Sequence, residues 1–167
     1  MKRLLFVSGL FPNQKYPTKG IFNKQRAFHL LKHFDVKVIS PLPWHLQRQL
    51  PSNDTIDDIP VDYPRYFMIP KIGRSLYGFL YAISMFPFMK RLFQQFSWDA
   101  MFVNWAYPDA FGMVLLNRFF KRPLFICVLG SDINIYTRSF LRRLMIVYAL
   151  KKATKIFAVA DQLRDKM

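Results

Sequence analysis

An uninterrupted apolar run, Leu124–Val128, is the feature of this sequence that most constrains its fold. Pro123, which cannot continue a preceding helix, comes directly before it, and Gly130-Ser131-Asp132 follow shortly after. A short strand without polar breaks is typical of a parallel sheet that is covered on both faces. Ligands of such sheets bind at the carboxyl ends of strands, so we expect a site at Gly130, Ser131 and Asp132. The simpler alternative is that Ser131 and Asp132 only cap the helix that follows.

Similar apolar segments alternate with helical patterns along the whole chain. We expect strands at residues 3–8, 36–40, 100–104, 124–128 and 155–159. We expect helices at residues 21–33, 75–95, 109–120 and 138–152, with a kink at Pro87, and the start of another helix at residue 161. This alternation predicts the α/β class, a Rossmann-like parallel sheet with helices on both faces and a right-handed crossover in its first βαβ unit.

Residues 41–72 interrupt the alternation with six prolines. We expect an ordered but irregular excursion there, with a short strand at residues 66–69. Its aromatic residues Trp44, Tyr63 and Tyr66 either stack on a sugar or a lipid or pack inside the protein, and packing is the simpler interpretation.

The charge balance is strongly positive. The 167 residues include 25 Lys and Arg against 10 acidic residues, all of them Asp, which gives a net charge of +15. Such a field favours phosphates, acidic lipid surfaces or nucleic acid as partners. No nucleic-acid-binding module is recognisable and the basic residues are scattered among α/β elements, so we expect no nucleic-acid partner.

Two of the expected helices combine basic and apolar residues. Lys90 and Arg91 belong to the aromatic helix at residues 75–95, and Arg142 and Arg143 accompany leucines in the helix at residues 138–152. Such helices can lie on an anionic membrane surface, or they can bury their apolar sides against the sheet and leave the charges in water.

The sequence contains no recognisable secretory signal, and its longest apolar stretch, residues 76–89, is too short to span a bilayer. The lone cysteine, Cys127, falls in an expected core strand, as is usual in a reducing compartment. We therefore expect a cytoplasmic protein that can lie on the inner face of the membrane.

Three expected loops leave the carboxyl ends of neighbouring strands and should cluster. They comprise residues 17–20, 104–109 and 130–134. The first precedes a helix whose free backbone N–H groups can hold a phosphate, and Gly20 lets a ligand approach the backbone closely. His29 and His33 have a spacing that suits a metal on a helix, but no third ligand is evident, so we expect neither a metal site nor a cofactor.

Several short motifs together resemble the amino-terminal domain of family 4 retaining glycosyltransferases, which have the two-domain GT-B architecture. The matching residues are Gly20-Ile21-Phe22, Gln25, Asp35-Val36, Tyr107-Pro108-Asp109, Gly130-Ser131-Asp132-Ile133-Asn134, Ala149 and Phe157-Ala158-Val159. The resemblance covers nearly the whole chain, and it implies that residues 1–167 form the acceptor-binding half of such an enzyme.

The resemblance also implies which residues bind substrates, while it leaves the catalytic residues unassigned. Gly20 would lie beside the phosphates of a nucleotide-sugar donor. The residues that would border the acceptor and the sugar are Asn104, Tyr107, Asp109, Gly130, Ser131 and Asp132. Two positions depart from many relatives, which have a glycine in place of Lys19 and a histidine in place of Leu129.

A larger departure is the lack of a donor-binding domain. In the family, a second Rossmann-like domain holds the nucleotide-sugar with a pair of glutamates, and this chain contains no Glu. We therefore expect an acceptor-side domain that is inactive alone, either a truncated gene product or one subunit of a split enzyme for a glycan or lipid-linked acceptor in polysaccharide biosynthesis. The alternative is a non-catalytic module that binds a membrane surface or a partner, so whether the chain is an enzyme stays open.

Overall fold

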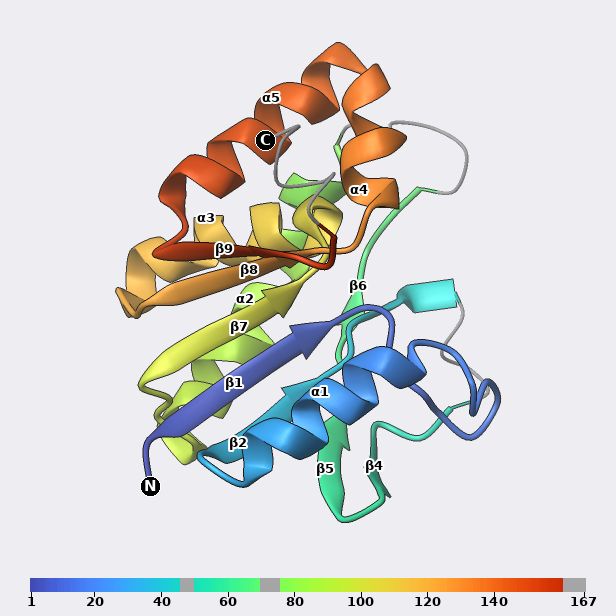
Figure 1. Ribbon diagram of the computed structural model, residues 1–167, viewed down its shortest axis with the longest axis vertical. Helices are drawn as coiled ribbons and strands as arrows, with labels where there is room; N and C mark the ends of the chain where they lie inside the picture. The colour runs from blue at the N-terminus through green and yellow to red at the C-terminus, as the bar shows by residue number, and fades with distance from the viewer. Residues whose placement is uncertain (46–49, 70–75, 161–167) are drawn as a thin grey trace.

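A seven-stranded sheet forms the centre of the computed structural model, which describes residues 1–45, 50–69 and 76–160 (Figure 1). The strands lie in the order β4-β5-β2-β1-β7-β8-β9, and all neighbours are parallel except β4 and β5. Their bounds are β1 Arg3–Ser8, β2 Asp35–Ile39, β4 Asn53–Ile56, β5 Ile59–Asp62, β7 Ala100–Asn104, β8 Leu124–Val128 and β9 Lys155–Ala158. The predicted Rossmann-like parallel sheet is confirmed.

Helices cover both faces of this sheet. The helices are α1 Ile21–Leu31, α2 Tyr77–Gln95, α3 Phe111–Phe120, the single-turn α4 Ser131–Asn134 and α5 Phe140–Lys152. In Figure 1, α1 lies in front of β1 and β2, whereas α2 and α3 lie behind the sheet. Of the helices in the described part of the chain, none is both long enough and apolar enough to cross a membrane.

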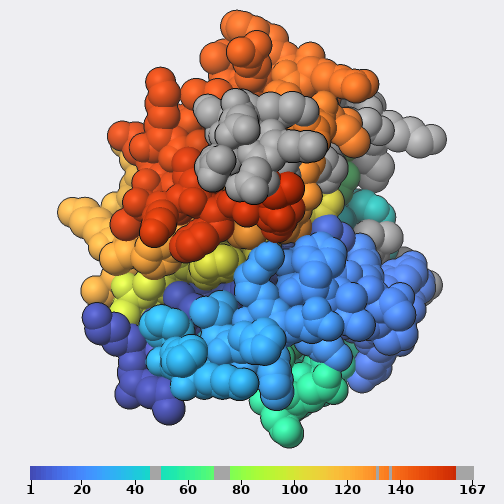
Figure 2. Space-filling model, viewed as in Figure 1, coloured from blue at the N-terminus to red at the C-terminus, as the bar shows by residue number. Residues whose placement is uncertain are grey.

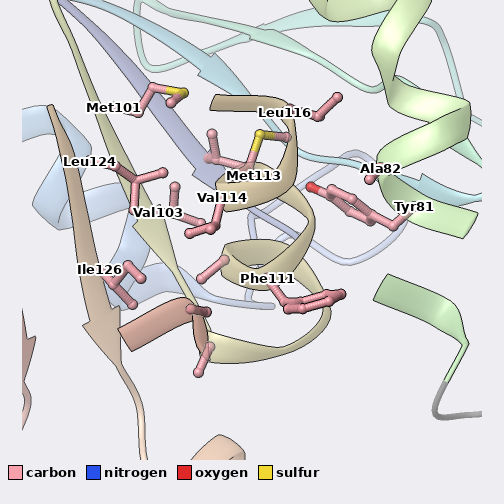
Figure 3. Close-up of a cluster of buried hydrophobic side chains, with 14 of the residues drawn as sticks. Tyr81, Ala82, Met101, Val103, Phe111, Met113, Val114, Leu116, Leu124 and Ile126 are labelled. Carbon is pink, nitrogen blue, oxygen red and sulfur yellow. The ribbon is translucent and has the colours of Figure 1, made fainter. Parts of the chain in front are cut away.

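Alternate residues of β1 belong to two separate hydrophobic cores. Leu5 and Val7 pack in a core with residues of α2, α3 and α5, whereas Leu4 and Phe6 pack in a core beneath α1. In the first core, Val114 of α3 lies against strands β7 and β8 (Figure 3). This period of two is what a strand covered on both faces requires. β1 is also the central strand of the sheet, with three strands on each side.

The proline-rich segment is more regular than its sequence predicts. Residues 53–62 form an antiparallel hairpin, β4 and β5, that extends the sheet beyond β2, so the expectation of an irregular excursion is wrong there. The two turn residues, Asp57 and Asp58, have φ angles of 47° and 63°, as in a tight hairpin turn. The short strand expected at residues 66–69 is instead β6, Arg65–Tyr66, which pairs with β3, Leu42–Pro43.

Two other expectations concern the helices. Pro87, where we expect a kink, lies exposed within one continuous helix, α2. The helix expected from residue 161 lies outside the described residues.

Candidate functional site

The chain changes direction across the sheet between β1 and β7. From β1 it passes through α1 to β2 on one side, whereas β7, β8 and β9 extend the sheet on the other side (Figure 1). In the space-filling view, the first βαβ unit, in blue, and the last elements, in orange and red, occupy adjoining areas of one face (Figure 2). Loops diverge at such a switch point and leave a crevice at the carboxyl edge of the sheet, where ligands bind.

A pocket of about 200 Å³ lies at this edge. The loops that follow β1, β2 and β7 line it together with one residue of β6. The lining residues are Gly9, Leu10, Lys19, Pro41, Leu42, Pro43, Tyr66, Trp105, Pro108 and Asp109. A larger hollow of about 390 Å³ lies beside α4 and α5, but its lining has a single ionisable side chain, Arg143, so it lacks an acid–base pair. We take the pocket at the switch point as the candidate site because it lies at the carboxyl edge of the sheet, where ligands of parallel sheets bind.

Asp109 is the acidic group of this pocket. It is 4% exposed, and its Oδ2 accepts a 2.7 Å hydrogen bond from the backbone N–H of Gly9. The pKa of Asp109 is raised to about 7: burial is the main cause, the hydrogen bond from Gly9 opposes it, and the nearby Asp132 adds a smaller increase. A carboxyl group with this pKa exchanges its proton near neutral pH, which is common in functional sites.

Tyr81 of α2 lies near Asp109. Its hydroxyl group is fully buried and has no hydrogen-bond partner in the described part of the chain. Burial raises the pKa of Tyr81 well above its usual value, and the charge of Asp109 adds to this shift. The ring centroid lies 5.0 Å from that of Tyr66, a pocket residue, so Tyr81 supports the wall of the pocket.

The carboxylate of Asp132 is fully engaged in hydrogen bonds with backbone N–H groups. Asp132 is fully buried, and its carboxylate accepts hydrogen bonds of 2.8–3.2 Å from the backbone N–H groups of Ala106, Leu129, Gly130 and Ile133. It thereby fixes the loop after β7 to the loop after β8. This geometry favours the capping interpretation of Asp132 over a substrate contact.

Asn104 and Tyr107 also hold loops in place. The buried side chain of Asn104 accepts a 2.6 Å hydrogen bond from Nη1 of Arg26 and donates one of 3.3 Å to the carbonyl of Val7. The hydroxyl of Tyr107 accepts a 3.1 Å hydrogen bond from the backbone N–H of Gly78, and burial raises its pKa. Both side chains therefore have structural partners and lie outside the lining of the pocket.

The two glycines predicted for the site have positive φ angles of 70° at Gly20 and 115° at Gly130. A Cβ atom added to Gly20 would lie 2.3 Å from the carbonyl oxygen of Leu10. The space beside Gly20 is thus filled by this chain's own backbone, which explains the glycine without a ligand. Gly130 closes the turn onto Asp132, and Ser131 begins α4.

The three predicted loops thus gather at one edge of the sheet, and Asp109 is the predicted residue that lines the pocket there. Gly9 and Tyr81 were not identified from the sequence as residues at this site. Gly9 had a usable signal, since it is the first residue after a predicted strand, whereas Tyr81 stands within a long aromatic helix that offers no such signal.

Comparisons with known proteins identify the same fold. Sucrose-phosphate synthase from Thermosynechococcus elongatus superposes with a TM-score of 0.72 at 8% identity, over 99% of this chain and 44% of that chain. A second structure of that enzyme gives 0.67 at 11% identity, over 98% of this chain and 79% of that chain. UDP-GlcNAc 2-epimerase from Methanocaldococcus jannaschii gives 0.58 at 11% identity, over 99% of this chain and 41% of that chain.

These identities are low, so the structural matches show the fold alone. No curated protein matches the chain in sequence. A family model described as glycosyl transferase 4-like matches residues 18–160, which confirms the resemblance inferred from the loops. By this match over most of its length, the chain belongs to the glycosyl transferase 4-like family.

Proposed function

We propose that this chain forms the acceptor-side wall of a retaining glycosyltransferase, which moves a sugar from a nucleotide-sugar donor to a glycan acceptor. One observation carries the proposal: the buried carboxyl group of Asp109, with a pKa of about 7, lines an open pocket at the switch point of a glycosyl transferase 4-like fold. At neutral pH such a group can accept a hydrogen bond from a sugar hydroxyl or donate one to it.

The pocket also offers a positive group for the donor. Lys19 lines the pocket two residues before α1, and no side chain caps the amino terminus of that helix. Together the ammonium group and the helix amino terminus suit a phosphate. We propose that the donor phosphates lie on this side and that Asp109 faces the sugar or the acceptor.

The proposal places the opposite wall of the cleft outside these 167 residues. A pocket of about 200 Å³ is smaller than typical ligand sites, as expected of one wall of a larger cleft. A second Rossmann-like domain, from a longer protein or from another polypeptide, would supply the donor site. The chain alone would then transfer no sugar.

A hybrid enzyme tests this function. The chain is joined to the carboxyl-terminal domain of another family member, and transfer from radiolabelled nucleotide-sugars to membrane acceptors is measured. We expect transfer by the hybrid and a loss of about tenfold or more in the Asp109→Asn hybrid, because the pocket loses its acidic group. The matched control is Asp99→Asn, which replaces an exposed aspartate before β7. A folded hybrid that transfers from no donor contradicts the proposal.

Docking on an anionic membrane surface is a second candidate function, either alone or with a lipid-linked acceptor. α2, α3 and α5 contain no acidic residue, yet Ile83, Phe119 and Phe140 on these helices are 72%, 69% and 73% exposed. The exposed cations of the same helices are Lys90, Arg91, Arg118, Arg143, Lys151 and Lys152. Exposed apolar side chains beside cations suit an interface of anionic lipid, which attracts each nearby cation by about 1 kcal/mol.

Co-sedimentation with lipid vesicles tests the docking. We expect binding to vesicles of phosphatidylglycerol and phosphatidylcholine that decreases with salt, and little binding to phosphatidylcholine alone, since the cations supply the attraction. Ile83→Ser should weaken binding, whereas the matched control Phe28→Ser, on the exposed side of α1, should not. Equal binding by both variants, or no binding at low salt, contradicts the docking.

A further inference from the structure

Trp44 and Phe67 form a pair of stacked aromatic rings at the surface. Their centroids are 6.3 Å apart and their planes differ by 18°. Trp44 is 43% exposed and Phe67 is 48% exposed, so nearly half of each side chain is in contact with solvent.

The two rings are held in place although they are exposed. Nε1 of Trp44 donates a 3.0 Å hydrogen bond to the carbonyl of Met68, and the backbone N–H of Phe67 donates one of 3.1 Å to Oγ of Ser84 on α2. This anchoring contrasts with Tyr63 in the same segment, which is 1% exposed and simply packs in the core beneath α1. A fixed, exposed aromatic surface loses little conformational entropy when a ligand covers it.

The pair adjoins the candidate pocket. Trp44 directly follows Pro43, and Phe67 directly follows Tyr66. Pro43 and Tyr66 are register partners in the β3–β6 pair, and both line the pocket. The aromatic pair therefore directly follows the pocket-lining residues on both strands, at the rim of the candidate pocket.

The chemistry of the pair suits a sugar ring better than a phosphate. Its faces are apolar and carry no charge, whereas the cation of the site, Lys19, lies in the pocket itself. One face of a pyranose ring presents C–H groups, which pack well on an aromatic plane while the hydroxyl groups at the ring edge stay hydrated.

We propose that Trp44 and Phe67 form a stacking platform for a pyranose ring of the acceptor. The inference rests on the proposed function, and it specifies the acceptor: a neutral oligosaccharide, with one sugar in the pocket and a further sugar on the platform. A bare lipid alcohol or lipid phosphate would leave the platform unused.

Binding of neutral sugars to the chain itself tests the platform. The probes are the methyl glycosides of disaccharides of glucose, of galactose and of mannose. Their binding is measured by saturation-transfer NMR and by titration. We expect the strongest transfer to C–H protons of one ring face. Trp44→Ala and Phe67→Ala should each weaken binding by about fivefold or more, and Trp44→Phe, which keeps an aromatic face, should stay within about twofold. Phe119→Ala, which removes a still more exposed aromatic ring on α3, is the matched control and should change nothing.

Several outcomes overturn the platform: no glycoside binds the wild-type chain, Trp44→Ala binds as well as wild type, or decyl phosphate competes for the pair while sugars do not. Circular dichroism and thermal unfolding identify a variant that has lost its fold, in which case Phe67→Leu, which keeps an apolar side chain but removes the aromatic face, decides.

Failure of the platform and failure of the proposed function are distinguishable. If a Trp44→Ala hybrid enzyme transfers sugar with an unchanged acceptor KM, the platform is contradicted and the proposed transferase function stands. If the chain binds sugars in a way that depends on Trp44 but its hybrids transfer no sugar, the platform stands and the proposed transferase function is contradicted.

Discussion

The backbone N–H of Gly9 donates a 2.7 Å hydrogen bond to Oδ2 of Asp109, and this bond joins the loops after β1 and β7 across the switch point of the sheet. A Cβ atom added to Gly9 would lie 3.0 Å from the same oxygen. Asp109 therefore occupies the space that a side chain at position 9 would need, and Gly9 in turn supplies a donor to the buried carboxyl group. The bond fixes the carboxyl group at the pocket.

Asp109→Asn should change how stability depends on pH. The pKa of Asp109 is about 7 in the folded chain against 3.8 in the unfolded chain, so the folded state binds more protons between these values. The free energy of unfolding of the wild type therefore falls as pH rises from about 4 to 7, whereas the variant lacks this contribution. The variant should gain on the order of 2–4 kcal/mol over the wild type across this range. Urea unfolding at several pH values checks this, and parallel curves for the two proteins would contradict it.

Asp132→Ala should lower the free energy of unfolding at neutral pH. It leaves four backbone N–H groups without their acceptor in a buried place. We expect a loss on the order of 3 kcal/mol or more in the free energy of unfolding, because unsatisfied buried donors are costly. Urea unfolding at pH 7 measures it, with Asp109→Asn as the paired control. A variant as stable as wild type would mean that the four amides find other partners.

Most of the sheet could be predicted because its central strands are apolar and separated by helices. The hairpin β4–β5 could not, since its strands have only four residues each, no side chain of β4 is buried, and Pro60 stands inside β5. Its signal was instead in the turn, where Asp57 and Asp58 adopt positive φ angles that aspartate tolerates.

At the candidate site, the sequence could not predict which of two aspartates lines the pocket. Asp109 and Asp132 both follow a strand, and in the sequence nothing separates their roles. Asp109 lines the pocket because Gly9, a residue 100 positions away, supplies one donor and leaves the carboxyl group at the cavity. Asp132 faces backbone amides on all sides because the loop after β7 folds over it. Such long-range partners cannot be read from local patterns.

Gly20→Ala should destabilise the chain much more than Gly9→Ala. At Gly20 the φ angle is 70° and the new Cβ would lie 2.3 Å from a backbone oxygen, which cannot move without its loop. At Gly9 the nearest atom belongs to the carboxyl group of Asp109, a side chain that can shift. We expect losses of about 3 kcal/mol or more and about 1 kcal/mol, respectively. Thermal unfolding of both variants checks the order, and equal losses would contradict it.

Tyr81→Phe should make the chain more stable. The hydroxyl group of Tyr81 is buried without a hydrogen-bond partner among the described residues, so its removal ends a desolvation cost while the ring keeps its packing on Tyr66. We expect a gain of about 1 kcal/mol in the free energy of unfolding. The matched control is Tyr107→Phe, which loses the hydrogen bond from Gly78 and should cost about 1 kcal/mol. Urea unfolding compares the two, and a loss at Tyr81 as large as the loss at Tyr107 would show that the Tyr81 hydroxyl does have a partner, such as a buried water.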